Sequence, residues 1–220
     1  MICKETLHNS LSAMVLITTV LNHAGMLFSL LVDWLRRLTI HRFYDHGLVA
    51  LLGNNSLITV SSYSEPRPKA LAQTPEGEIH SWSLISPNHT LSRSVEVLLS
   101  VEKTVYVVDA TDCEDRFLDI GPFSHISVSP DGRYVNLYGV NGKAHVISSD
   151  FQERLFEHDS DSQTPPLYVE WCGSDALIAW EDEVHIIGPG DVSSSYIYDS
   201  TRVHVVSGKS SASMGGIMLT

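Results

Sequence analysis

Short antiparallel hairpins recur along most of this chain, and this recurrence restricts the fold more than any other feature. Four segments place bulky or β-branched residues on both sides of a central turn, at residues 48–60, 96–109, 136–148 and 177–188. Their turns lie about 40–50 positions apart, which is the length of one blade of a β-propeller. Because a blade buries its faces only against neighbouring blades, the repeat favours a propeller over a β-sandwich.

The third repeat carries the clearest turn chemistry. Ser129–Gly132 reads Ser-Pro-Asp-Gly and suits a type I turn, because proline presets φ at the second position. Asn141-Gly142 predicts a two-residue hairpin turn in which both residues hold φ > 0. The other hairpins turn near Asn54-Asn55, Glu102-Lys103 and Asp182-Glu183, and lead-in strands precede two of the four at 126–130 and 168–173.

The predicted fold class is therefore all-β: a partial β-propeller of about four blades of antiparallel meanders, preceded by an apolar N-terminal helix. We expect three regions. These are an apolar helical segment over residues 1–43, a partial propeller over 44–206 and an irregular tail over 207–220. The first and last repeats are incomplete, so the sequence predicts part of a larger propeller.

The N-terminal segment leaves two alternatives open. Residues 11–32 contain no charged side chain and are long enough to span a bilayer. Thr18, Thr19 and Asn22 interrupt the apolar run, and the chain lacks the basic start and the cleavage site of a signal peptide. We favour a helix packed within the protein over a membrane anchor.

Charge and cysteine usage exclude some classes of protein. The net charge of -12 does not fit a nucleic-acid-binding protein, which needs a basic surface. The three cysteines, Cys3, Cys113 and Cys172, are odd in number and fit no zinc-ligand spacing. They predict free thiols in a reducing compartment.

The residue types that carry catalysis or bind metals form no known arrangement here. Gly208-Lys209-Ser210 resembles the end of a phosphate-binding loop, but Val203 stands where that loop needs glycine. The acidic stretch at 109–119 lacks the glycine turn of a calcium loop, and it predicts a solvated loop between blades. Cys113 and Cys172 have no supporting nucleophile motif.

Histidine and tryptophan also fit structural roles better than chemical ones. His125 and His145 fall in predicted strands and His158 lies beside an acidic run, with no paired helical spacing. Trp171 and Trp180 are expected to pack between blades. A propeller enzyme would place charged residues on its innermost strands, and the predicted inner strands carry only Glu170. We therefore assign no catalytic, cofactor-binding or metal-binding residue and expect no cofactor.

Several stretches give the chain a family resemblance between Tyr44 and about Val206. The most specific are the pair Trp171-Cys172, the triplet Ala179-Trp180-Glu181 and the corner Ser149-Asp150-Phe151. In their order and spacing they resemble the N-terminal propeller region of the vacuolar protein sorting-associated protein 16 family, on its fungal branch. The matching stretches read RSVEVLLSVEKTVYVVDA, DIGPFSHISVSPDGRYVNLY, SSDFQERLFEHDS, YVEWCGSDALIAWEDEVHIIGP and YIYDSTRVHVV.

The resemblance implies a non-enzymatic subunit of the HOPS and CORVET tethering complexes, acting in protein transport to the vacuole and in vacuole fusion. It also implies protein partners in those complexes and a cytoplasmic location, peripheral on late endosome or vacuole membranes. No nucleic acid or small-molecule substrate is expected. The alternatives are a membrane-anchored β-protein that uses residues 11–32 and a propeller enzyme.

The chain departs from the family pattern at both ends. The apolar stretch before residue 43 stands where early propeller strands are expected, and a short tail follows Val206 where further strands are expected. The family's C-terminal helical solenoid, which holds a Sec1/Munc18-type subunit, is not matched. The expectation is therefore a truncated chain or a short isoform, to which no partner-binding residue carries over.

Overall fold

The computed structural model of the protein describes most of the chain after residue 38. The described residues are 39–43, 47–62, 67–162, 164–188, 192–197, 203–206 and 216–219, with the backbone alone in the first range and the last two. Every regular element in these ranges is a β-strand. The apolar helix predicted over residues 11–32 lies outside the described residues.

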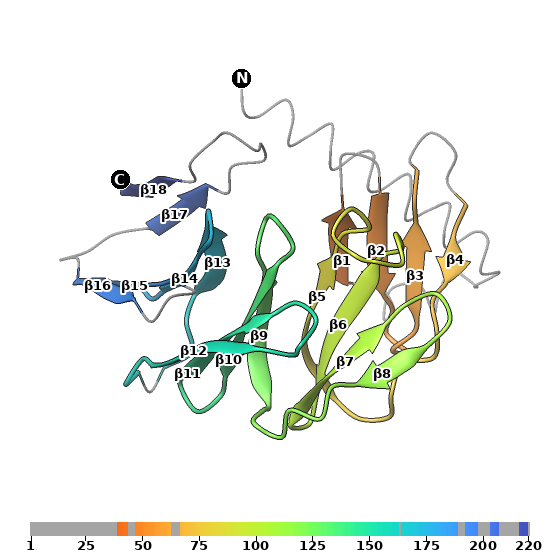
Figure 1. Ribbon diagram of the computed structural model, residues 1–220, viewed down its shortest axis with the longest axis horizontal. Helices are drawn as coiled ribbons and strands as arrows, with labels where there is room; N and C mark the ends of the chain where they lie inside the picture. Colours follow the sequence, from red (N-terminus) through yellow and green to blue (C-terminus); the bar gives the residue numbers. More distant parts are fainter. Residues whose placement is uncertain are drawn as a thin grey trace, which may run out of the picture. The chain divides into compact units, whose positions relative to one another are not determined.

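The strands form four sheets of four antiparallel strands each, followed by a two-stranded pair. In every sheet, strands that follow one another in the sequence lie side by side, so each sheet is a meander (Figure 1). The sheets begin at Thr39, Ile79, Phe123 and Tyr168, a spacing that matches about 40–45 residues per blade. The predicted all-β fold, a partial β-propeller, is confirmed.

The chain divides into two compact units, and the first comprises the residues up to Thr74 together with Ala110–Asp112. It contains the first sheet, whose second strand is buried along its whole length. The strands of the first sheet are β1 (Thr39–Phe43), β2 (Gly47–Leu51), β3 (Leu57–Val60) and β4 (Lys69–Ala70).

Strand β1 corrects one sequence-based prediction. Residues 39–43 belong to the segment predicted to be helical, yet they pair with β2, from Thr39 opposite Leu51 to Phe43 opposite Gly47. The residues β1 contributes, TIHRF, include two β-branched side chains and one aromatic side chain, which are types that favour strands.

The second unit contains the remaining sheets. The second sheet consists of β5 (Ile79–Ile85), β6 (Glu96–Val101), β7 (Thr104–Val108) and β8 (Cys113–Asp115). The third sheet consists of β9 (Phe123–Val128), β10 (Tyr134–Gly139), β11 (Lys143–Ser148) and β12 (Arg154–Asp159). The fourth sheet consists of β13 (Tyr168–Cys172), β14 (Asp175–Ala179), β15 (Glu183–Ile187) and β16 (Ser193–Ile197).

The two-stranded pair corrects the expectation of an irregular tail. Strand β17 (Val203–Val206) pairs with β18 (Gly216–Leu219), with Val203 opposite Leu219. The predicted tail over 207–220 therefore ends in a strand. Its residues, GIML, supply apolar and β-branched side chains suited to pairing.

Apolar side chains fill the space between the second and third sheets. One face of the second sheet packs against one face of the third, with Phe123 of β9 fully buried. Burial of this kind is the main favourable contribution to folding. The buried residues of this cluster are Ile85, Leu98, Val105, Val107, Phe123, Ile126, Val135, Leu137 and Ile147.

The opposite face of the third sheet packs against the fourth sheet, and both sheets contribute aromatic residues. Trp171 of β13 stacks on Tyr134 with ring centroids 6.3 Å apart, and Trp180 meets the edge of Tyr138 at 6.2 Å. Both tryptophans are almost fully buried. The prediction that they pack between blades is confirmed.

The turn between β10 and β11 differs from the predicted one. Tyr138 pairs with Ala144, and the backbone N–H of Gly142 donates to Gly139 O at 3.2 Å, so three residues form the loop. Gly142 holds φ +81°, as predicted, whereas Asn141 does not have a positive φ. The loop is a type I turn followed by a left-handed glycine, and the predicted two-residue turn is wrong.

One local turn occurs twice in the third sheet. After β9, Ser129 Oγ donates to Asp131 Oδ1 at 2.7 Å, and Gly132 follows with φ +69°. After β11, Ser148 Oγ donates to Asp150 Oδ1, and Phe151 follows with φ +63°. The serine hydroxyl also accepts a backbone N–H five positions later in each turn. Both turns therefore share one hydrogen-bonding pattern.

Candidate functional site

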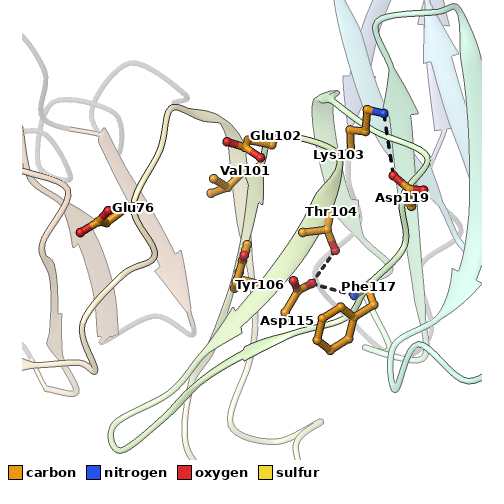
Figure 2. Close-up of a pocket in the computed structure, with 9 residues that line it drawn as sticks. All are labelled: Glu76, Val101, Glu102, Lys103, Thr104, Tyr106, Asp115, Phe117 and Asp119. Atoms are coloured by element: carbon orange, nitrogen blue, oxygen red, sulfur yellow. Dashed lines mark hydrogen bonds and ion pairs between the residues drawn. The ribbon is translucent and has the colours of Figure 1, made fainter.

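A hollow in the second unit lies at one end of the second sheet, with a volume of about 510 Å³ (Figure 2). The β6–β7 turn, the end of β8 and the loop after β8 form its walls. Figure 2 shows its lining residues, with Lys103 facing Asp119 and with Asp115 bonded to Thr104 and Phe117. The lining residues are Glu76, Val101, Glu102, Lys103, Thr104, Tyr106, Asp115, Phe117 and Asp119.

Asp115 is held in place by its neighbours. Its Oδ1 accepts hydrogen bonds from Thr104 Oγ1 and from the backbone N–H of Phe117, both at 2.7 Å (Figure 2). The Thr104 hydroxyl in turn accepts the backbone N–H of Leu118 at 3.1 Å. Because these bonds fix the loop that follows β8, the Thr104–Asp115 pair has a structural role.

Acidic side chains outnumber basic ones in the lining of the hollow. Glu76, Glu102, Asp115 and Asp119 supply four carboxylates, against the single ammonium group of Lys103. Lys103 Nζ lies 3.9 Å from Asp119 Oδ1, and both side chains are largely exposed, so this ion pair is weak. Desolvation and the charge of Asp115 raise the pKa of Tyr106. This lining suits contact with a positively charged group.

Exposed apolar side chains lie on loops and on the two edge strands of the fourth sheet, β13 and β16. Phe117, at the rim of the hollow, is 83% exposed and holds φ +50°. Leu91, in the loop between β5 and β6, is fully exposed. The large exposed hydrophobic residues are Leu91, Phe117, Val140, Leu167, Tyr168, Val192, Tyr196 and Ile197.

Strand β16 differs from the outer strands of the second and third sheets. Strands β8 and β12 carry charged residues, including Glu114 and Asp115 in β8. Strand β16 reads SSSYI, carries no charge, and has all five side chains exposed. Charged residues on an edge strand oppose pairing with another chain.

Two histidines that the sequence separates by 27 positions meet where the third and fourth sheets pack. His158 Nε2 of β12 lies 2.8 Å from His185 Nδ1 of β15, and His185 Nε2 lies 2.7 Å from Glu183 Oε1. Sequence reasoning missed this contact. Only the packing of the third sheet against the fourth brings the two rings together, and no short-range motif records that packing.

The other residues singled out from the sequence fall as follows. Cys113 and Cys172 are not joined in a disulfide, whereas Cys3 lies outside the described residues. Three residues of the acidic stretch at 109–119 form strand β8, which corrects the expectation of a loop there. Gly208-Lys209-Ser210 also lies outside the described residues.

His125 and His145 lie in strands β9 and β11, as predicted, and burial lowers the pKa of both. Glu170 lies on β13, and desolvation raises its pKa.

Within the described ranges, no group of three or more metal-ligating side chains is arranged around a common point. No helix in those ranges is long and apolar enough to cross a membrane.

The chain is similar to a known protein family over most of its length. A family model described as "Vps16, N-terminal region" matches residues 36–210. A probable vacuolar protein sorting-associated protein 16 homologue of Schizosaccharomyces pombe is 30% identical over 172 residues, which cover 74% of this chain and 21% of the relative. The protein VACUOLELESS1 of Arabidopsis thaliana is 24% identical over 181 residues, covering 71% of this chain and 21% of the relative.

A vacuolar protein sorting-associated protein 16 homologue of Dictyostelium discoideum is 23% identical over 155 residues, covering 65% of this chain and 18% of the relative. The chain thus spans about a fifth of the length of these relatives. Among solved structures, BBS1N in its crystal complex with ARL6DN superposes with a TM-score of 0.57 at 12% identity. That match covers 79% of this chain and 58% of the other, and it supports the fold alone.

Proposed function

Since this chain belongs to the family of the Vps16 N-terminal region, we propose that it is a non-enzymatic part of a membrane-tethering complex that acts in vacuolar protein sorting. Its role in that complex is to contact other proteins. The complexes proposed are HOPS and CORVET, which hold endosomal and vacuolar membranes together before fusion. The proposed location is the cytoplasmic side of late endosome and vacuole membranes, as a peripheral protein.

The extent of the family match carries this proposal. Residues 36–210 include every described strand from β1 to β17. The three relatives match over similar lengths of this chain, and two of them are named for vacuolar protein sorting. Repeat proteins, in which sheets pack through buried apolar layers and expose their loops, commonly serve as scaffolds for contacts with other proteins.

The arrangement of side chains supports a contact role over catalysis. The Thr104 hydroxyl and the Asp115 carboxylate, which form the hollow's closest nucleophile-and-base pair, are both held by backbone amides of the next loop. Exposed Phe117 and Leu91 offer apolar anchors on two different loops of the second sheet. Aromatic and large apolar anchors dominate the binding energy of protein interfaces.

Affinity purification tests the proposal. The chain, tagged and expressed in its own cells, should enrich the other subunits of a HOPS or CORVET complex, relative to an unrelated propeller that carries the same tag. The variants Phe117→Ser and Leu91→Ser alter exposed side chains only, so each should leave the fold intact. If one variant recovers less of the other subunits than the unaltered chain does, the substituted residue belongs to the contact surface. Enrichment of no tethering subunit by the unaltered chain would refute the assignment.

A further inference from the structure

The contact between His158 and His185 is one end of a three-residue chain that joins the third and fourth sheets. His158 belongs to β12, whereas His185 and Glu183 belong to β15. The His158 Nε2 to His185 Nδ1 distance is 2.8 Å, and the His185 Nε2 to Glu183 Oε1 distance is 2.7 Å. Both distances are those of strong hydrogen bonds.

The direction of donation in this chain follows from the chemistry of its end group. An ionised carboxylate can only accept, so His185 Nε2 carries the proton that lies toward Glu183. In the neutral pair, His185 Nδ1 is then an acceptor, and His158 Nε2–H donates to it. This leaves His158 Nδ1 as the one ring nitrogen with a free lone pair.

The order in which the two histidines take up added protons follows from this arrangement. A first added proton goes to the free Nδ1 of His158 and leaves both hydrogen bonds in place. A second added proton gives N–H groups on both facing nitrogens, which cannot remain 2.8 Å apart because neither can accept. One added proton therefore leaves the hydrogen bonds in place and costs free energy only because the charge is buried, whereas a second proton breaks the His158–His185 bond.

The buried surroundings also make the first protonation, at His158, unfavourable in free energy. His185 is 5% exposed and the ring of Trp180 lies 5.0 Å from its ring, while Phe156 stacks on His158 at 6.4 Å. The titratable groups around His158 are His185 and Glu183 from β15, and Asp159 and Asp161 from its own segment. Desolvation, followed by the neighbouring His185, lowers the pKa of His158, although the three carboxylates oppose this shift.

We propose that the chain formed by His158, His185 and Glu183 is a pH-sensitive contact, which holds the third and fourth sheets together when both rings are neutral and weakens as they take up protons. Acidification would loosen the packing around Trp171 and Trp180, because these residues belong to the same layer. This contact should respond in the pH range where imidazole groups titrate.

The sign of the pH dependence can be stated. The ordinary histidine pKa is 6.5, and the pKa of His158 in the folded protein lies below it. The unfolded chain therefore binds the proton at higher pH than the folded chain. The stability from this group is fully present above about pH 6.5 and is lost as the pH falls below that value.

The full chain with His158→Gln tests the proposal. The glutamine amide nitrogen can replace the Nε2 donor, but it does not titrate. Between pH 7.5 and pH 5.5, we expect the thermal midpoint of the wild type to fall by about 2–4 °C more than that of the variant. An equal fall in both proteins would overturn the proposal.

The matched control is His80→Gln, which alters an exposed histidine of β5 and should lose as many degrees as the wild type. The control is needed because His125 and His145 also have lowered pKa values and contribute to the total fall. NMR of the wild-type ring nitrogens gives a readout that needs no variant. At pH 7.5, His158 should carry its proton on Nε2, and acid should add one at Nδ1. A proton on Nδ1 at pH 7.5 would contradict the hydrogen-bond chain.

Discussion

At the scale of single residues, the two related turns of the third sheet show how one backbone conformation accepts different side chains. Gly132 holds φ +69° without cost, whereas Phe151 holds φ +63° at the equivalent place. A positive φ is unfavourable for phenylalanine. Its ring packs against the apolar layer between the second and third sheets, and the guanidinium of Arg116 lies 5.5 Å from the ring centre. These contacts offset the strain.

Gly142 is a position where a side chain should be poorly tolerated. It holds φ +81°, and a Cβ atom there would lie 3.0 Å from Ser162 O. We expect Gly142→Val to destabilise the protein by roughly 1–3 kcal/mol, because valine at positive φ is strained. The thermal midpoint measures the loss.

A matched substitution separates the strain from the crowding at Gly142. Gly173 holds φ +67°, and nothing lies within 4 Å of the place of its Cβ. Gly173→Val should therefore lower the midpoint by less than Gly142→Val. A Gly142→Val protein as stable as the wild type would contradict the turn geometry described above.

At the scale of elements, hydrogen bonding distinguishes the two tryptophans between the third and fourth sheets. Trp180 Nε1 donates to Thr164 O at 2.9 Å, whereas Trp171 Nε1 is buried and has no partner among the described residues. Replacement by phenylalanine removes a similar volume at both places. Trp180→Phe should cost about 1 kcal/mol more than Trp171→Phe, because only the former loses a hydrogen bond.

Urea unfolding of both variants provides the measurement, since equal slopes with different midpoints report a change in stability alone. If Trp171→Phe proved the more destabilising of the two, a partner for Trp171 Nε1 would have to exist, and the packing described for this layer would need revision.

Local chemistry made the hairpins predictable, because proline, asparagine and glycine specify a turn within four residues. The turn over Ser129–Gly132 is confirmed by the backbone bond from Gly132 N–H to Ser129 O at 2.8 Å. The contact of His158 with His185 could not be predicted, because it depends on how two sheets align. The three-residue loop at Gly142 could be predicted only in part. Its glycine was evident, but the loop length depended on the register of β10 with β11.

At the scale of the whole molecule, residues 11–32 decide between the proposed peripheral location and the membrane-anchored alternative. This segment has no charged residue and lies outside the described ranges. A peripheral protein is released from membranes by alkaline carbonate, whereas a spanning helix is retained. We expect the chain to move to the soluble fraction on extraction of cell membranes.

A known peripheral subunit and a known spanning protein serve as controls in the same extraction. Retention of the chain with the spanning protein would favour the membrane-anchored alternative. A variant with Leu21→Asp within the apolar run should then be released, because a charged residue at the centre of a spanning helix is costly.

The third sheet packs against the second on one face and against the fourth on the other. A middle layer opens only if one of its neighbours opens too, whereas the outer strand β16 is exposed along all five residues. Backbone amides at Val135, Leu137 and Val146 should therefore exchange their hydrogens with solvent far more slowly than those of β16. Within the second unit, local stability should therefore rise from the outer strand β16 to strands β10 and β11.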